Sequence, residues 1–242
     1  RGATEPAEKA DASGVAPVGW RVYRDLLTFP RYVLVILGYV AQTFAMGGFS
    51  FWAPTFLVRV HHMGLAAAGG FFGEALVITG LVATLGGGYL ATMWQRRTGT
   101  GYAWVLALSS LSTAPAAFAA FTLPNLAHAK VALTVSMFLL FLCTGPVNTL
   151  ILETVPVRMR ASAVAASIFS IHMFGDLWSP KFVGYLSDRW GDLQRACLWA
   201  LPGTLVVSAA FWCWLVVIER RKQAAAAASQ PCFAEQPRKS AD

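Results

Sequence analysis

Six long apolar stretches, separated by short polar gaps, dominate this sequence. Each is long enough to cross a hydrocarbon layer about 30 Å thick, which takes roughly 20 helical residues. The stretches are too long for the roughly 10-residue alternating strands of a membrane barrel, so helices are the remaining way to pair the backbone in lipid. The sequence therefore predicts an all-α integral membrane protein with six transmembrane helices. The predicted spans are residues 32–58, 65–94, 102–123, 131–152, 161–186 and 196–218.

Composition supports a membrane protein and excludes other classes. Of the 242 residues, 56% are hydrophobic and 13% are charged, which is too apolar for one soluble core. The net charge of +7 does not predict a nucleic-acid partner, because Lys and Arg lie at the ends of the apolar stretches and form no single patch. The four cysteines have no zinc or disulfide spacing, so we expect neither metal nor cofactor.

Basic residues alternate between the gaps and give each span a direction. The set predicted to face the cytoplasm is Arg21, Arg24, Arg31, Arg96, Arg97, Arg158, Arg160, Arg220, Arg221 and Lys222. The opposite gaps hold only Arg59, Lys130, Arg189 and Arg195. By the positive-inside rule, both termini lie in the cytoplasm and the protein resides in the cell (inner) membrane. We expect residues 1–31 to form a cytoplasmic linker, 32–222 the six-helix unit and 223–242 a disordered cytoplasmic tail.

Spans one and four share a small, polar middle. Residues 42–48 of span one read QTFAMGG, and residues 143–148 of span four read CTGPVN. Since each span leads a group of three, we expect two three-helix repeats in which both of these helices are interrupted at the midplane. Span two carries small residues at spacings of four, which predict close helix packing or a sliding contact. These residues are Gly69, Gly73, Gly80, Thr84 and Gly88.

Several motifs resemble the C-terminal half of major facilitator superfamily transporters, and the Spinster-like family most of all. They are FWAPTFL at 51–57, TGPVN at 144–148, VPVRMRASA at 155–163, IHMFGDLWSP at 171–180 and GYLSDR at 184–189. The opening RGATEP at 1–6 is similar to the linker between the two halves. The resemblance implies helices seven to twelve of a twelve-helix secondary transporter, with an N-terminal six-helix half and membrane lipids as partners. It also implies alternating access for a small amphipathic or lipid-like solute, driven by protons.

The same resemblance points to two cytoplasmic gate regions. Gly88, Arg96 and Arg97 match the superfamily's loop signature, but Thr92, Met93 and Gln95 replace its usual acid, base and glycine, which weakens a gating role. The second region combines Glu153 with Arg158 and Arg160. These three form either a gate ion pair or a solvated pair at the interface.

Ionisable residues inside the spans are the first candidates for function, because an unpaired charge in lipid is unfavourable. His172 and Asp176 lie four residues apart on one helix face, an arrangement suited to a proton relay. Alternatively, they form a buried pair beside a kink at Pro180, or they contact solute. Glu74 and Lys181 are both in the outer third and are candidates for an external latch; alternatively, Glu74 reaches a water-filled vestibule.

A midplane group of amides, hydroxyls and aromatics suggests a solute pathway. Its members are Gln42, Thr43, Trp52, Thr144 and Asn148. Such a mixture suits an amphipathic solute better than a sugar, although ordinary interhelical hydrogen bonding uses the same residue types.

Two other classes of function compete with a transporter. An aspartyl protease needs two carboxylates that share a proton, but the spans hold a single aspartate, Asp176, and Met173 stands where the protease motif needs a glycine, so we expect no enzyme. A stand-alone six-helix channel or assembly protein remains the alternative. The first residue is Arg1 rather than Met, and we expect the chain to be part of a longer protein.

Overall fold

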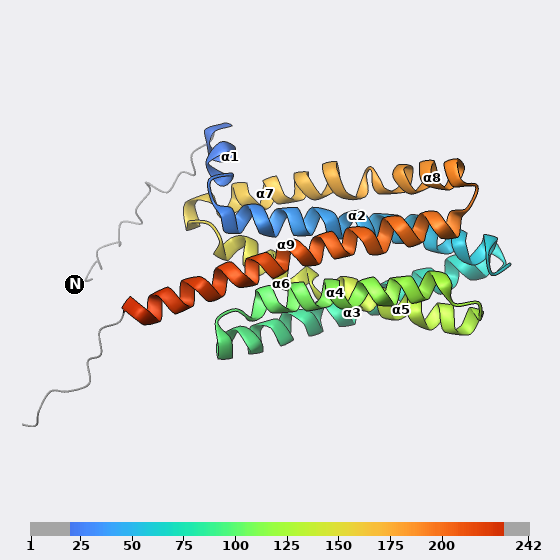
Figure 1. Cartoon of the computed structure of the whole chain (residues 1–242), viewed down its shortest axis with the longest axis horizontal. Coiled ribbons are helices and arrows are strands. Elements are labelled where there is room, and N and C mark those ends of the chain that lie inside the picture. The colour runs from blue at the N-terminus through green and yellow to red at the C-terminus, as the bar shows by residue number, and fades with distance from the viewer. Residues whose placement is uncertain (1–19, 230–242) are drawn as a thin grey trace, which may run out of the picture.

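The computed structural model describes residues 20–229, and these residues form helices with no strand. The elements are α1 (Trp20–Leu26), α2 (Pro30–Arg59), α3 (Leu65–Thr98), α4 (Gly101–Thr122), α5 (Leu126–Leu142), α6 (Thr144–Glu153), η1 (Val157–Met159), α7 (Arg160–Ser170), η2 (Ile171–Asp176), α8 (Ser179–Trp190) and α9 (Leu193–Ser229). The predicted all-α class is confirmed. Figure 1 shows the long helices running side by side in one elongated bundle.

Five helices in the described range are long and apolar enough to cross a membrane. They are Pro30–Arg59, Leu65–Thr98, Gly101–Thr122, Leu126–Glu153 and Leu193–Ala228, which correspond to predicted spans one to four and six. Predicted span five is present in three pieces, α7, η2 and α8, that follow one another along the bundle (Figure 1). The chain is therefore a multi-pass membrane protein, and its fifth apolar stretch is a segmented rod.

The break in this rod is a π-helical turn, not a kink at Pro180. In η2 the Leu177 amide donates to the His172 carbonyl at 3.3 Å, five residues earlier. Pro180 instead lies in the first turn of α8, where a missing N–H leaves no hydrogen bond unmade. Single π turns of this kind are frequent at functional sites.

Only one of the two interruptions expected at the midplane is present. Span four breaks at Cys143, between α5 and α6, whereas α2 runs unbroken through Gly47 and Gly48. A Cβ on Gly47 would lie 2.7 Å from the Asp176 Cβ, so this glycine admits η2 at close range. The small residues of span one thus permit contact between helices and do not end the helix.

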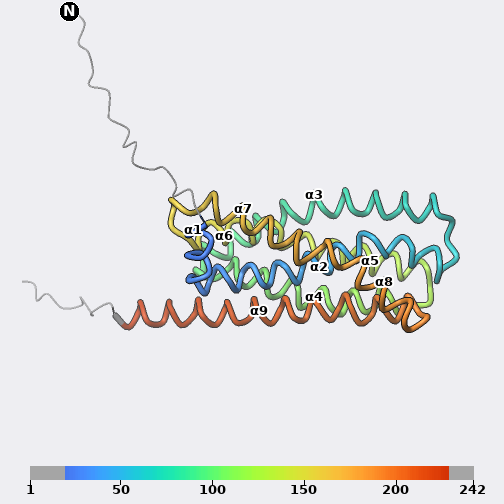
Figure 2. The backbone as a smooth tube through the Cα atoms, turned by 90° about the horizontal axis from the view of Figure 1, so that it is seen from above, coloured from blue at the N-terminus to red at the C-terminus, as the bar shows by residue number. Residues whose placement is uncertain are grey.

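The tightest packing joins helices that are distant in sequence. α9 packs along both α2 and α4, and the largest fully buried side chain, Trp212 of α9, lies over Gly38 of α2. By contrast, α3 runs along the opposite edge of the bundle from α9 (Figure 2). Only 22% of the most apolar part of α3 is buried, against 50% in α2. Although α2 and α3 follow one another in sequence and are in contact, each packs more extensively against other helices.

The later part of the small-residue row in α3 packs within this chain. Gly88 lies against Gly145 of α6, with 3.2 Å between its Cα and a Cβ placed on Gly145, and Gly80 faces Phe141. Gly69 and Gly73 have nothing within 4 Å of a Cβ. The first part of this row is thus an open surface in the described structure.

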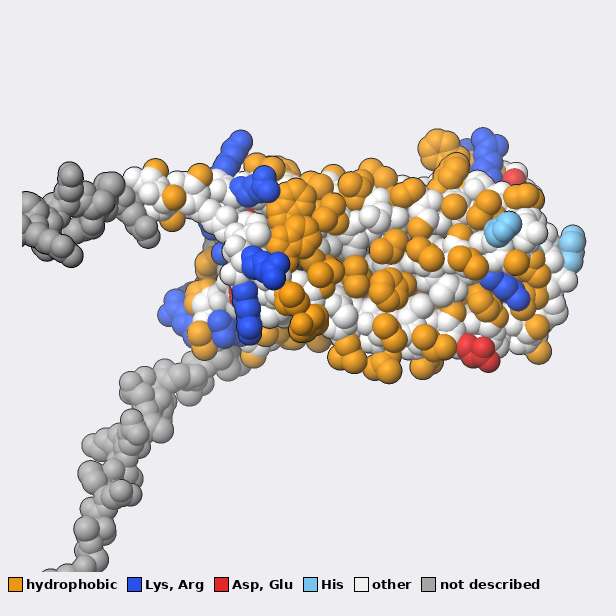
Figure 3. All heavy atoms as spheres, turned by 90° about the horizontal axis from the view of Figure 1, so that it is seen from below, with side chains coloured by type: hydrophobic (Ala, Val, Ile, Leu, Met, Phe, Trp, Pro, Cys, Tyr) orange, Lys and Arg blue, Asp and Glu red, His pale blue; other side chains and the backbone are white. Residues whose placement is uncertain are grey.

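Basic side chains are more numerous at one end of the bundle than at the other. Figure 3 shows Lys and Arg clustered at the end that holds α1 and the last turns of α9, while hydrophobic side chains cover the middle of this face. This is the charge pattern expected of a bundle whose middle lies in hydrocarbon.

Helix extends beyond the predicted membrane unit on both sides. α1 lies within the stretch expected to be linker, and α9 continues over residues 223–229, where a disordered tail was expected. Five consecutive alanines at 224–228 explain the extension, since alanine has the highest helix propensity. The rest of the predicted linker and tail, residues 1–19 and 230–242, lies outside the described residues.

Candidate functional site

An open groove of about 610 Å³ follows the π turn and contains the predicted proton pair. It is lined by Ile168, Phe169, His172, Met173, Asp176 and Leu177. All six come from α7, η2 and the residue after it, so the groove is a feature of the segmented rod. Apolar walls around a single ionisable pair suit a solute with both polar and apolar parts.

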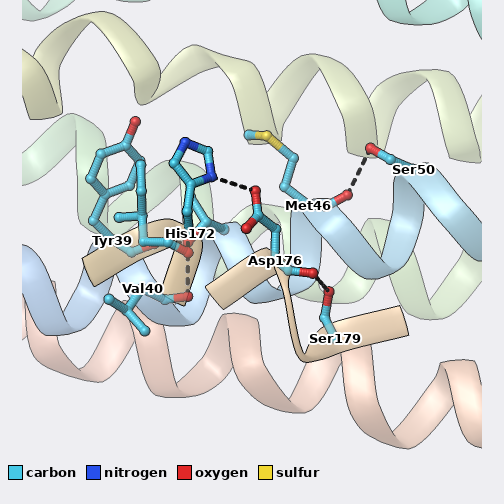
Figure 4. A network of polar contacts seen from close by, with 9 residues as sticks. Tyr39, Val40, Met46, Ser50, His172, Asp176 and Ser179 are labelled. Atoms are coloured by element: carbon cyan, nitrogen blue, oxygen red, sulfur yellow. Dashed lines mark hydrogen bonds and ion pairs between the residues drawn. The ribbon is translucent and has the colours of Figure 1, made fainter. Parts of the chain in front are cut away.

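His172 and Asp176 contact each other at the surface of this groove. The His172 Nδ1 lies 2.9 Å from the Asp176 Oδ2, and the two side chains are 63% and 39% exposed. The pair is therefore not buried between spans, as one alternative required. In Figure 4 the side chains of Tyr39 and Met46, from α2, point to the same side as His172. The contact between the imidazole and the carboxylate is therefore open to the groove.

The π turn is fastened to α2 by close backbone contact. The Thr43 hydroxyl lies 2.9 Å from the Tyr39 carbonyl and 3.5 Å from the Ile171 carbonyl, and it is the group that a Cβ on Gly175 would overlap. The Ser179 hydroxyl donates to the Asp176 carbonyl at 3.3 Å (Figure 4). Buried Thr43 thus fixes the turn that presents His172, and it is not itself exposed to the groove.

Trp52 fastens the outer part of the rod. Its indole Nε1 donates to the Pro180 carbonyl at 2.9 Å, and a Cβ on Gly184 would lie 3.1 Å from its ring. The half-buried indole therefore joins α2 to α8. This contact holds the beginning of α8 in place beyond the π turn.

Gln42 belongs to a buried network between helices. Its amide nitrogen donates to the Leu140 carbonyl at 2.7 Å and contacts the Cys143 sulfur, while its oxygen accepts from Ser110 at 3.3 Å. Ser110 lies 3.2 Å from Ser208, which donates to the Gly38 carbonyl. With 1% of its surface exposed, Gln42 links α2, α4, α5 and α9 inside the bundle. This geometry favours the interhelical alternative for Gln42.

Thr144 and Asn148 lie on the helix that follows the break in span four. The Asn148 amide is exposed and donates to the Thr144 carbonyl at 2.8 Å. The Thr144 hydroxyl oxygen is buried and has no hydrogen-bond partner among residues 20–229. Buried polar atoms are rarely left unpaired, so this hydroxyl is a place where water or solute gains a hydrogen bond.

The structure does not bring the predicted latch together. Glu74 and Lys181 are both exposed, and the ion pairs within residues 20–229 are Arg31–Glu219 and His172–Asp176. The Lys181 ammonium instead lies 5.5 Å from the ring centre of Trp178, on its own rod.

The charged gate candidates are exposed at the basic end and are in neither ion pair of the described residues, whereas Gly88 is half-buried against Gly145. Arg160 donates to the Leu152 carbonyl at 3.0 Å, and Glu153 is exposed. Of the remaining candidates, Arg96, Arg97 and Arg158 are exposed as well.

The ion pair at this end instead joins Arg31 to Glu219, two residues that sequence reasoning did not single out as a pair. They connect the start of α2 to α9, 188 positions apart, and Glu219 is 9% exposed. One sequence signal was present: Glu219 is a lone acid that immediately precedes three basic residues.

Comparisons with known proteins show what this chain is similar to. No family model matches. The probable sphingolipid transporter spinster homolog 2 of Arabidopsis thaliana is 33% identical over 210 residues, which cover 84% of this chain and 43% of that protein. The sphingosine-1-phosphate transporter of Danio rerio is 28% identical over 170 residues, or 65% of this chain and 34% of that protein.

A solved structure gives the same answer at the level of the fold. A bacterial homolog of the human lysosomal transporter Spinster, inward-facing and unoccupied, superposes with a TM-score of 0.63 at 20% identity, over 90% of this chain and 52% of that one. The predicted resemblance to Spinster-like transporters is confirmed. This Spinster-like chain spans about half the length of the relatives it matches. The relatives are named as transporters and not as enzymes.

Proposed function

We propose that this chain is the C-terminal half of a secondary transporter that moves a lipid-like amphiphile by alternating access. The observation that carries the proposal is the His172–Asp176 pair on an open, otherwise apolar groove, in a chain whose relatives are named as sphingolipid and sphingosine-1-phosphate transporters. A long-chain solute would lay its hydrocarbon against Phe169, Met173 and Leu177. Its polar head would meet the pair.

The proposed half contains six crossings in two groups of three. The five long helices and the α7–α8 rod add up to six, and an even number agrees with α1 and the end of α9 lying at the same end of the bundle (Figure 1). The basic side chains at that end support a cytoplasmic location for both termini in the cell membrane. The open groove on the α7–α8 rod is then where an N-terminal six-helix half would enclose a cavity.

Coupling to protons is assigned to His172 and Asp176. The Asp176 carboxylate lies 2.9 Å from the His172 Nδ1, and both side chains are exposed to the groove, where a proton can reach them. Protonation on one side of the membrane and release on the other would then accompany each cycle.

Transport by the longer protein tests this function. Reconstituted into vesicles, it should accumulate a fluorescent sphingosine analogue when a pH gradient is imposed, and a sugar should not compete. Asp176→Asn and His172→Gln should abolish accumulation and leave downhill exchange measurable. His128→Gln, which changes an exposed histidine outside the groove, is the matched control. If accumulation in both groove variants still depends on the pH gradient, the two residues are not a proton relay. If the wild-type protein does not transport the amphiphile, the proposed function is wrong.

A further inference from the structure

A second groove lies at the basic end of the bundle, on the last turns of α3. It is an open depression of about 300 Å³, lined by Leu90, Met93, Trp94, Arg97 and Thr98 of this helix. We propose that this groove binds an anionic phospholipid of the surrounding membrane, with Arg97 on the phosphate and the outer face of α3 along one acyl chain. The site shares no lining residue with the His172 groove, and the proposal is independent of what the protein transports.

Charge selects an anionic occupant. Arg97 lines the groove and takes part in neither ion pair of the described residues. A guanidinium presents two parallel N–H groups to a phosphate, a strong and geometrically specific contact. Arg97 also lies in the last turn of α3, at the end where cationic side chains gather, which is the level of lipid head groups (Figure 3).

The negative end of the α3 dipole opposes an anion at this place, but two of the last four carbonyls of the helix are paired. The Gly99 amide donates to the Gln95 carbonyl at 2.7 Å, and the Gln223 side chain of α9 donates to the Thr98 carbonyl at 3.0 Å. These hydrogen bonds reduce the negative potential that the guanidinium has to outweigh.

An apolar track leads from Arg97 toward the middle of the bilayer. Val82, Gly86, Leu90 and Met93 precede Arg97 at steps of three or four and share one helix face. The three side chains are 55%, 47% and 38% exposed, and nothing lies within 4 Å of a Cβ on Gly86. Fifteen residues of helix measure about 22 Å, longer than the roughly 15 Å of hydrocarbon in one leaflet. The track is therefore long enough for a whole acyl chain.

Trp94 gives the groove a fixed wall. Its ring stacks on Trp104 with 6.3 Å between centroids and 11° between planes, and the Arg220 guanidinium lies 4.9 Å from the Trp104 ring centre. The pair of indoles fixes the wall, and Arg220 adds positive charge behind it. Indoles at this depth are typical of the membrane interface.

Native mass spectrometry of the detergent-purified chain tests the site. With phosphatidylglycerol and phosphatidylcholine of equal acyl chains, wild type should retain phosphatidylglycerol preferentially. Arg97→Gln should lower that retention about tenfold, the loss expected for one charge-assisted contact. Arg96→Gln removes the same charge from the neighbouring exposed position, which does not line the groove, and should retain the lipid as wild type does.

Gly86→Leu separates a lipid from a free phosphate. It fills the open track without touching Arg97, so it should weaken phosphatidylglycerol retention, and glycerol phosphate should not compete. Equal losses in Arg96→Gln and Arg97→Gln would show only diffuse charge attraction and overturn the site. An unaffected Arg97→Gln, a competing glycerol phosphate, or loss of the lipid in the longer protein would overturn it too. Melting temperatures should match wild type, since both changed positions are exposed.

Discussion

Gln42 and His172 are polar residues of membrane spans, and the molecule uses them in opposite ways. The two residues lie near each other, because Thr43, which follows Gln42, contacts Ile171, which precedes His172. Gln42 is 1% exposed and has both ends of its amide bonded by other helices, whereas His172 is 63% exposed at its side chain and has one partner, on its own helix. A polar group whose hydrogen bonds are all made by neighbouring helices holds them together. One left open to a groove is available to a solute or a proton.

The same contrast separates adjacent glycines of α3. Gly87 faces the break in span four, where a Cβ would overlap the Leu142 carbonyl oxygen, and Gly86 faces open space. One face of α3 is therefore closed by backbone contact, and the other is an accessible surface.

The largest expected effect comes from the closed face. Gly87→Ala should destabilise the protein by about 3 kcal/mol or prevent folding, because the methyl group meets backbone that has no rotamer to move. Thermal unfolding in detergent measures this, with Gly86→Ala as the control. Equal melting temperatures for the two variants would show that α3 does not pack against residue 142.

A smaller loss is expected at the buried ion pair. Glu219→Gln should lower stability by roughly 2 kcal/mol, since the Arg31 guanidinium is left uncompensated in a mostly buried place. Glu153→Gln, at an exposed acid of the same end, should melt within 1 °C of wild type, a shift below about 0.5 kcal/mol. If Glu153→Gln lowers the melting temperature more than Glu219→Gln does, the partner of Arg31 is Glu153 of α6 and not Glu219 of α9.

The Gln42 network should contribute less again. Gln42→Leu preserves volume but removes the amide, and one interhelical hydrogen bond in a membrane protein is worth about 1 kcal/mol. His172→Gln and Asp176→Asn should leave the melting temperature unchanged and act on transport alone. If the groove variants destabilise as much as Gln42→Leu does, the distinction between the two sites is lost.

The smallest effect is expected at the proposed latch. Glu74→Gln and Lys181→Gln, singly or together, should change stability by less than about 0.5 kcal/mol, because both side chains are exposed and unjoined in this chain. A double variant that differs from the sum of the single variants would reveal coupling between them in solution.

Hydropathy alone was enough to place the spans, because the requirement to cross hydrocarbon acts on each segment by itself. Spans one, two, three and six are each a single helix, and span four is the pair α5 and α6. The π turn at 171–176 could not be predicted, since nothing in its sequence rules out an ordinary helix and its contact with α2 joins positions 128 residues apart. The Arg31–Glu219 pair was equally hidden, because it joins positions 188 residues apart.

The sequence predicted which residue types form the candidate site, but not which of their side chains face the interior of the bundle. Spacing alone gave the His172–Asp176 contact, since residues four apart on a helix meet. Nothing in the local sequence told which polar side chains face inward, so Gln42 and Asn148 were grouped although one is buried and the other exposed. That information lies in how helices distant in sequence pack.

The π turn η2 divides the rod into two helical pieces, α7 and α8. The Tyr32 hydroxyl donates a hydrogen bond to the Ala163 carbonyl of α7, and the Trp52 indole donates one to the Pro180 carbonyl of α8. Both anchors come from α2, and the π turn between them is fastened to the same helix through Thr43. One helix therefore holds the rod at three points, and the ionisable pair lies at the middle one.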